Sequence, residues 1–286
     1  MPAIDLPLGT LDYRVFGPDA PGLPTAVFVH GFLVNGTLWD AVARRLADAG
    51  VRSVVPDWPL GAHRTPVPAR SDLSPRSVAA AVLDLLAALD LQDAVLVGND
   101  TGGAICQLAL AGDRQRVGGL VLTNTDAFEA FPPAFFVPLF RAARVRAAVW
   151  ALLQTTRPRL VRHSLLAFGP LLNRPRSSAL TRGWIQPALD DAAIRRDIVR
   201  VARGLRGDEL RDAAGWLGSF DSPARLVWGT GDRNFRVQLG RRLAAALPAA
   251  ELVEVAGATT FVPVDRPDAV SEAIVTVLGQ VARRRS

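Results

Sequence analysis

The stretch AVLVGNDTGGAICQLAL, residues 94–110, decides the fold. It begins as a short buried-strand pattern and continues as a helix, with almost no loop between them. Gly98 and Gly102 lie two residues on either side of Asp100, so the backbone is free to turn sharply there. We predict that Asp100 projects from a strained turn at the end of a central strand. The alternative is a glycine-rich turn in which Asp100 only caps the helix.

Strand and helix patterns alternate before this turn. Short β-branched runs at 25–30 and 52–56 predict strands, and the segments at 37–50 and 74–90 carry apolar residues at helical spacing. Such alternation is typical of α/β proteins, in which helices cover both faces of a mostly parallel sheet.

The pattern changes in the middle of the chain. Residues 131–205 are poor in strand patterns, helical in character and dotted with prolines, whereas ARLVWG at 224–229 and AELVEVA at 250–256 restore the alternation. We therefore predict a core made of residues 1–130 and 206–286, with a helical cap of residues 131–205 inserted into it.

Composition excludes several classes of protein. A chain of 286 residues that is 49% hydrophobic can bury a large core, and no run of about 20 uncharged residues is present to cross a bilayer. All 33 basic residues are arginines spread among acids, so the net charge of +6 does not predict nucleic-acid binding. Cys106 stands alone, which excludes an intrachain disulfide and a cysteine-rich metal site. The first residues carry no secretory pattern, so we expect a cytoplasmic protein that does not bind membranes.

Further motifs lie at the expected ends of other strands. The segment His30-Gly31-Phe32 follows a strand, and the backbone N–H of Phe32 would form an oxyanion hole together with that of Thr101. Asp232, in VWGTGD, follows a later strand, where a carboxylate can orient a catalytic base.

On the segments HGF, PDWPLGAH, GNDTGG, VWGTGD and FVPVDRPD, in that order, the chain resembles the α/β-hydrolase superfamily over nearly its full length. With aspartate at the turn, it is most similar to the haloalkane dehalogenase and epoxide hydrolase branch. The resemblance implies an eight-stranded sheet, a helical cap after strand six, Asp100 as nucleophile and Asp232 as its acid. It also implies a catalytic histidine directly before FVP, and Thr260 occupies that place here.

The chain has only three histidines to replace it. His30 belongs to the oxyanion motif, and His163 lies among apolar residues of the predicted cap. His63 follows a strand whose end should lie near the site, so it is a candidate base, as are Asp232 and Asp126. Asp126 follows the sixth strand, where some relatives carry their acid.

Other features of that branch are also missing. Epoxide hydrolases of this type protonate the opening ring with cap tyrosines, and the single tyrosine here is Tyr13, near the N-terminus. Dehalogenases commonly hold the halide with a tryptophan and an asparagine at the places of Thr101 and Phe32. Trp150 and Trp184 in the cap are candidates for lining a substrate pocket, with core packing as the alternative.

Three functions remain open. The first is a hydrolase acting on a small, largely apolar or aromatic substrate through Asp100, whose carboxylate needs no base to attack an sp³ carbon. The second is a cofactor-free lyase, isomerase or cyclase that uses Asp100 as general acid or base, and the third is a catalytically silent ligand-binding protein. We expect no cofactor and no metal, and a homodimer is open.

Overall fold

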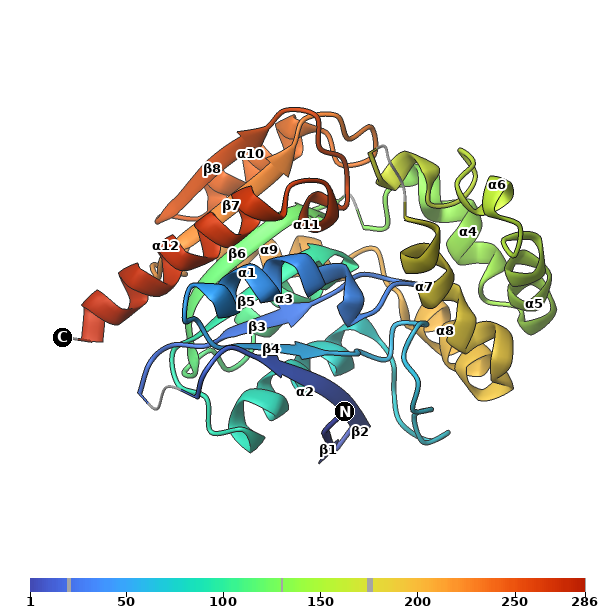
Figure 1. Cartoon of the computed structure of the whole chain (residues 1–286), viewed down its shortest axis with the longest axis horizontal. Coiled ribbons are helices and arrows are strands. Elements are labelled where there is room, and N and C mark those ends of the chain that lie inside the picture. The colour runs from blue at the N-terminus through green and yellow to red at the C-terminus, as the bar shows by residue number, and fades with distance from the viewer. Residues whose placement is uncertain (20–21, 130, 174–176, 286) are drawn as a thin grey trace.

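The structure is a computed structural model that describes residues 1–19, 22–129, 131–173 and 177–285 (Figure 1). Ala130, the last residue of the first predicted core segment, lies outside the described residues, as does Ser286 at the end of the second. An eight-stranded sheet forms the centre, in the order β1-β2-β4-β3-β5-β6-β7-β8. The strands are β1 (Ala3–Leu6), β2 (Gly9–Phe16), β3 (Ala26–Val29), β4 (Ser53–Pro56), β5 (Ala94–Asp100), β6 (Val117–Thr125), β7 (Ala224–Gly229) and β8 (Ala250–Val255).

Strand β2 runs antiparallel to both β1 and β4, and the ladder from β4 to β8 is parallel. The helices that cover the sheet are α1 (Asp40–Asp48), α2 (Pro75–Ala88), α3 (Thr101–Leu110), α9 (Glu209–Leu217), α10 (Val237–Ala246) and α12 (Pro267–Arg285). Helix α1 packs with α12 on the near face in Figure 1, whereas α3 packs with α2 and α9 behind the sheet. The predicted fold class is therefore confirmed.

Between β6 and β7 the chain forms a group of helices that Figure 1 shows together beyond the ends of the strands. We call α4 (Val137–Ala142), α5 (Arg146–Thr155), α6 (Arg159–Arg162), α7 (Ser178–Asp190) and α8 (Ala192–Gly204) the inserted helices. Two short 3-10 turns, η2 (Ala134–Phe136) and η3 (Gly169–Leu171), accompany them. The helical insertion comes after the sixth strand, as predicted, and the division of the chain into core and cap domains stays a prediction.

Helix starts follow the predicted local chemistry. Ser74 caps α2 by accepting a hydrogen bond from the backbone N–H of Ser77, with Pro75 as the first helical residue. Gly50 lies two residues after the end of α1 and has a φ of +74°, which glycine adopts without strain. The short 3-10 turn η1 (Gly36–Trp39) precedes α1, so the helical segment predicted at 37–50 divides in two.

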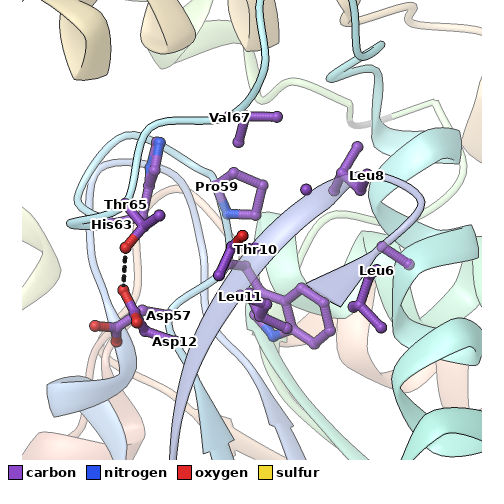
Figure 2. A pocket seen from close by; sticks show the side chains of 13 residues that line it. Leu6, Leu8, Thr10, Leu11, Asp12, Asp57, Pro59, His63, Thr65 and Val67 are labelled. Carbon is purple, nitrogen blue, oxygen red and sulfur yellow. Dashed lines mark hydrogen bonds between the residues drawn. The ribbon is translucent and has the colours of Figure 1, made fainter. Parts of the chain in front are cut away.

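A surface pocket lies beside the N-terminal hairpin of β1 and β2. Leu6, Leu8 and Leu11 of the hairpin line one side, and the loop after β4, with His63, lines another (Figure 2). The Thr65 hydroxyl donates a hydrogen bond of 2.6 Å to Asp12 and joins this loop to β2. None of the lining residues belongs to the turn at Asp100.

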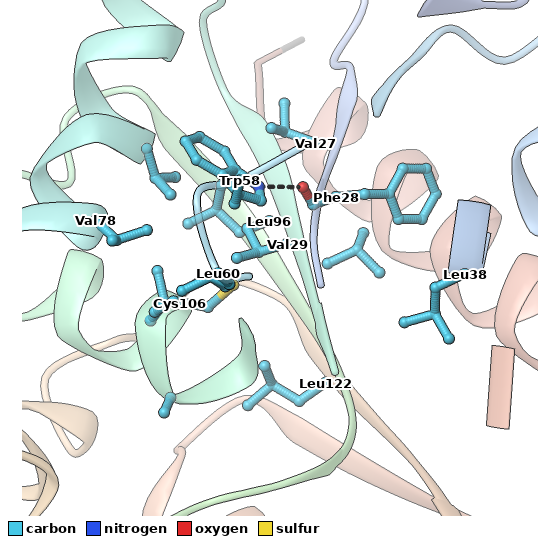
Figure 3. Close-up of a cluster of buried hydrophobic side chains, with 14 of the residues drawn as sticks. Val27, Phe28, Val29, Leu38, Trp58, Leu60, Val78, Leu96, Cys106 and Leu122 are labelled. Atoms are coloured by element: carbon cyan, nitrogen blue, oxygen red, sulfur yellow. Dashed lines mark hydrogen bonds between the residues drawn. The ribbon is translucent and has the colours of Figure 1, made fainter. Parts of the chain in front are cut away.

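The core fills the space between the sheet and its helices. Val27, Val29, Leu96 and Leu122, from three adjacent strands, meet side chains of the flanking helices (Figure 3). Trp58 is fully buried there, and its indole N–H donates to the Phe28 carbonyl at 2.9 Å. These contacts hold the carboxyl ends of β3, β5 and β6 in fixed positions.

Among the described residues, the longest apolar helices fall short of what a membrane crossing requires.

Candidate active site

Asp100 stands at the junction of β5 and α3 in a backbone conformation that non-glycine residues rarely adopt, with φ 54° and ψ −134°. The Thr125 hydroxyl donates to the Asp100 carbonyl at 2.7 Å and fixes the turn from the neighbouring strand. A β-carbon on Gly98 would lie 2.6 Å from the α-carbon of Gly103, so the strand and the helix can meet this closely only at glycine. The turn has the strained geometry expected from the sequence.

The carboxyl group of Asp100 lies deep in the molecule, although the residue as a whole is only half-buried. Removal from water raises the pKa of Asp100 to about 7, and the neighbouring carboxyl of Asp232 adds to this shift. The backbone N–H groups of Thr101 and Phe32 hydrogen-bond to the carboxylate and oppose it, as does the Thr101 hydroxyl. The structure thus brings Asp100, Phe32 and Thr101 together.

Gly31 makes this arrangement possible. A β-carbon at this position would lie 2.1 Å from Oδ2 of Asp100 and 2.7 Å from its carboxyl carbon. The carboxylate therefore rests directly on the backbone of the loop after β3, where Phe32 supplies its N–H.

Asp232 and Thr260 form a second part of the site. Thr260 is fully buried, and its hydroxyl donates to Oδ2 of Asp232 at 2.8 Å. The same oxygen accepts from the Asn124 amide at 2.9 Å, and Oδ1 accepts from the backbone N–H groups of Asn234 and Phe235. Burial raises the pKa of Asp232, and these hydrogen bonds partly oppose that rise because they stabilise the ionised carboxylate. With four donors, the carboxylate has its usual acceptor sites filled.

Asp126 follows the last residue of β6. Because Asp100 pairs with Thr125 in the parallel β5–β6 ladder, the two aspartates lie at the same end of adjacent strands. Asp126 is only 1% exposed, and among the described residues its Oδ1 has no hydrogen-bond partner. Gln107 of α3 fixes its backbone by donating to the Asp126 carbonyl at 2.8 Å. Burial raises the pKa of Asp126 well above its usual value, and the charge of Asp100 raises it further.

The histidines are engaged elsewhere. His30 Nε2 accepts from the backbone N–H of Trp58 at 2.8 Å, and its Nδ1 lies 3.0 Å from the Gly31 carbonyl. Burial lowers the pKa of His30 to about 3, so this ring stays neutral and supports the loop. His163 lies at the end of α6, with Nε2 2.8 Å from the Thr181 hydroxyl.

His63 lies in the loop after β4 and is almost fully buried. Its Nδ1 accepts from the Gly61 N–H at 3.3 Å, and its Nε2 lies 3.4 Å from the carboxylate of Asp197 in α8. Arg196 and Arg200 bind the other oxygen of that carboxylate. The contacts of His63 therefore join a loop to an inserted helix, and no contact joins it to Asp100 or Asp232.

The inserted helices contribute aromatic side chains next to these residues. Phe140 of α4 stacks on Phe32 at a centroid distance of 4.9 Å. Trp184 of α7 is buried and meets the ring of Phe261, the residue after Thr260, at 5.3 Å. Trp150 of α5 is 54% exposed, so this candidate for lining a pocket lies largely in solvent.

Two polar residues that the sequence did not single out organise the site. Asn124 binds Asp232 and also exchanges hydrogen bonds with the backbone of Gly229, which joins the ends of β6 and β7. The Asn99 amide donates to the Thr260 carbonyl at 2.7 Å. Their signal in the sequence is an amide side chain at the end of an otherwise apolar strand, a costly placement unless the amide is hydrogen-bonded.

Within the described part of the chain, no group of three or more histidine, cysteine, aspartate or glutamate side chains could hold a metal ion.

The fold and the strained turn define a protein of the α/β-hydrolase class. The family model described as alpha/beta hydrolase fold matches residues 24–267, and the chain belongs to that family.

Named relatives lie at moderate distance. The chain is 28% identical over 241 residues to a 2-hydroxy-6-oxononadienedioate/2-hydroxy-6-oxononatrienedioate hydrolase of Paraburkholderia xenovorans, covering 81% of this chain and 78% of the relative. It is also 28% identical over 264 residues to haloalkane dehalogenase 2 of Mycobacterium bovis, covering 90% and 88%. The fold is similar to that of a thermophilic esterase from Thermogutta terrifontis, with a TM-score of 0.74, 22% identity, and coverage of 99% and 100%.

Proposed function

We propose that this chain is a hydrolase-fold enzyme in which the Asp100 carboxylate attacks an sp³ carbon of a small, largely apolar substrate and forms an ester with it. The observation that carries the proposal is the position of that carboxylate, on a strained turn and against the backbone N–H groups of Phe32 and Thr101. Asp100 as a whole residue is half-buried, so it is not sealed inside the core.

The same contacts favour a nucleophile over a general base that works beside an oxyanion hole. The two N–H groups bind Asp100 itself, so they are not free to bind an enolate oxygen of a substrate. Once it is ionised, above its pKa of about 7, a carboxylate oriented in this way by two donors needs no further base to attack carbon. The reaction as proposed uses no cofactor.

The aromatic rings of Phe32, Phe140, Trp184 and Phe261 support an apolar substrate. Arg162, an arginine of the inserted helices that is buried, donates to the carbonyls of Thr156 and Arg157 and is thereby occupied. The 28% identity to a haloalkane dehalogenase also supports displacement at a saturated carbon.

Breaking the ester requires a water molecule activated by a base. Thr260 stands where the superfamily has its histidine, and a hydroxyl that donates to Asp232 is not basic near neutral pH. Thr260 therefore supplies no base, and we expect an ester formed from an alkyl halide to break down slowly near neutral pH unless another residue acts as the base.

The test is intact-mass spectrometry after incubation with a short-chain alkyl bromide. We expect a mass increase of one alkyl group, mapped by peptide digestion to Asp100 and absent from Asp100→Asn. Asp221→Asn, which changes an exposed aspartate, is the matched control and should be alkylated at Asp100 like the unaltered chain. No adduct at Asp100 with any of a series of bromides, or an equal adduct in Asp100→Asn, would overturn the proposal.

A further inference from the structure

One buried carboxyl at the site has no role in the reaction described so far. Asp126 is 1% exposed, and its Oδ1 has no partner among the described residues. An unpaired polar atom in such a place destabilises the fold. Asp126 follows Thr125, the residue of β6 that pairs with Asp100, and neighbouring strands of a sheet lie about 4.8 Å apart.

Resting on the proposed function of Asp100, we propose that Asp126 is the acid and then the base of the reaction, and that the natural substrate has an oxygen leaving atom that must take up a proton.

In the first step, the Asp100 carboxylate attacks carbon and the carbon–oxygen bond of the substrate breaks. The leaving oxygen takes the proton of the Asp126 carboxyl group. The products are an ester on Asp100, a hydroxyl group on the substrate and an Asp126 carboxylate, so charge and protons balance. The negative charge that disappears from Asp100 reappears on its neighbour.

In the second step, the Asp126 carboxylate takes a proton from water while the water oxygen attacks the carbonyl carbon of the ester. The bond between that carbon and the ester oxygen, which came from Asp100, breaks, and the alcohol leaves with this oxygen and the second proton of the water. Asp100 returns as a carboxylate and Asp126 as a neutral acid. Asp126 thus donates a proton in the first step and accepts one in the second, as the general acid of many hydrolytic enzymes does.

The structure favours Asp126 over Asp232 for this role. The oxygens of Asp232 accept four hydrogen bonds, from Thr260, Asn124, Asn234 and Phe235. A carboxylate so occupied has neither a proton to give nor a free lone pair for water. Tyr13, the single tyrosine of the chain, pairs with Pro56 in the β2–β4 ladder and is no alternative acid at this site.

The protonation states also suit the two roles. Burial and the neighbouring charge of Asp100 raise the pKa of Asp126 well above its usual range, whereas the pKa of Asp100 is about 7. Of the pair, Asp100 therefore ionises first and Asp126 stays protonated. The carboxyl of Asp232 also raises the pKa of Asp100. Arg242 stacks on Phe128, two residues after Asp126, and forms an ion pair with exposed Glu129.

The test compares a short-chain epoxide with the alkyl bromide of the same carbon number, because only the epoxide oxygen needs a proton. The measured quantity is the ratio of the two rates of ester formation at Asp100. In Asp126→Asn we expect this ratio to fall by at least about 100-fold, the lower range for general acid catalysis. A ratio within about threefold of that of the unaltered chain would overturn the proposal. Absence of both adducts in the unaltered chain would instead refute the role of Asp100.

A second measurement uses the unaltered chain alone and does not depend on the folding of a variant. Ester formation from the bromide should rise through pH 7 and then stay level, because only Asp100 must ionise. Ester formation from the epoxide should rise and then fall, because Asp126 must remain protonated. Breakdown of the ester in H₂¹⁸O should accelerate at alkaline pH and place ¹⁸O in the Asp100 carboxyl. Identical pH profiles for the two reagents would contradict the acid role, and pH-independent breakdown would contradict the base role.

Discussion

Thr260→His places an imidazole where the superfamily resemblance predicts the catalytic base, and the structure sets the size of the expected effect. The Thr260 hydroxyl lies 2.8 Å from Oδ2 of Asp232, so a ring N–H at this position has a carboxylate already in place. Three other donors hold that carboxylate, and it should not move when the hydroxyl is removed. The second ring nitrogen would then be free to activate water.

General-base help of this kind typically contributes about 10²- to 10⁴-fold, or about 3–5 kcal/mol of barrier. Thr260 is fully buried, and its neighbour Phe261 packs on Trp184, so the larger ring should reduce stability by about 1–3 kcal/mol. That loss lies within the usual stability of a domain. We expect the Asp100 ester to disappear at least about 100 times faster at pH 7 than in the unaltered chain.

The assay forms the ester with an alkyl bromide, removes the reagent by desalting and follows the mass of the protein with time. Thr260→Val is the matched control, because it removes the hydroxyl at nearly constant shape. It should reduce stability by about 1–2 kcal/mol and leave the ester lifetime within a few-fold. If Thr260→His is folded and its ester persists unchanged, Thr260 does not lie where a base can reach the ester.

Three further variants test the site and its surroundings. Gly31→Ala should reduce ester formation at least tenfold, measured by the same mass assay, because its methyl group would displace the Asp100 carboxylate. Asp100→Asn should raise the melting temperature at pH 8 more than at pH 5. The folded-state pKa of about 7 exceeds the unfolded value, so ionisation of Asp100 destabilises the folded protein as pH rises from about 4 to 7, by on the order of 4 kcal/mol. His63→Ala should lower the melting temperature, since it removes a contact with buried Asp197, while ester formation changes less than threefold.

The fold could be predicted because its determinants are local. Apolar runs at the places of β3 to β6, separated by helical patterns with good caps such as Ser74, match the central strands and helices of the structure. Gly98 and Gly102 around Asp100 specify the sharp turn by sterics alone. The predicted helical segment divides into η1 and α1. Asn35 caps η1 by accepting a hydrogen bond from the backbone N–H of Thr37.

The state of the site could not be predicted, because it depends on contacts between distant residues. Asn124 and Asp232 are 108 positions apart, and their hydrogen bond is one of the four that occupy the acceptor sites of the Asp232 carboxylate. His63 meets Asp197 across 134 positions, which no local pattern indicates. From the sequence, Asp232, Asp126 and His63 are all candidates for the missing base, and burial and hydrogen-bond partners distinguish them in the structure. Their catalytic roles stay predictions.

The energetics of the site favour an enzyme over a silent binding protein. A non-glycine residue at φ 54° costs on the order of 1–3 kcal/mol, and Asp126 adds a buried oxygen without a partner. Asp100 adds a carboxylate whose ionisation the fold opposes. None of these features would help a pocket that only holds an apolar ligand, since a neutral residue at each place would give a more stable chain with the same aromatic surroundings. All three would serve the proposed reaction, in which the strained turn directs Asp100 as the nucleophile and burial keeps Asp126 protonated beside it.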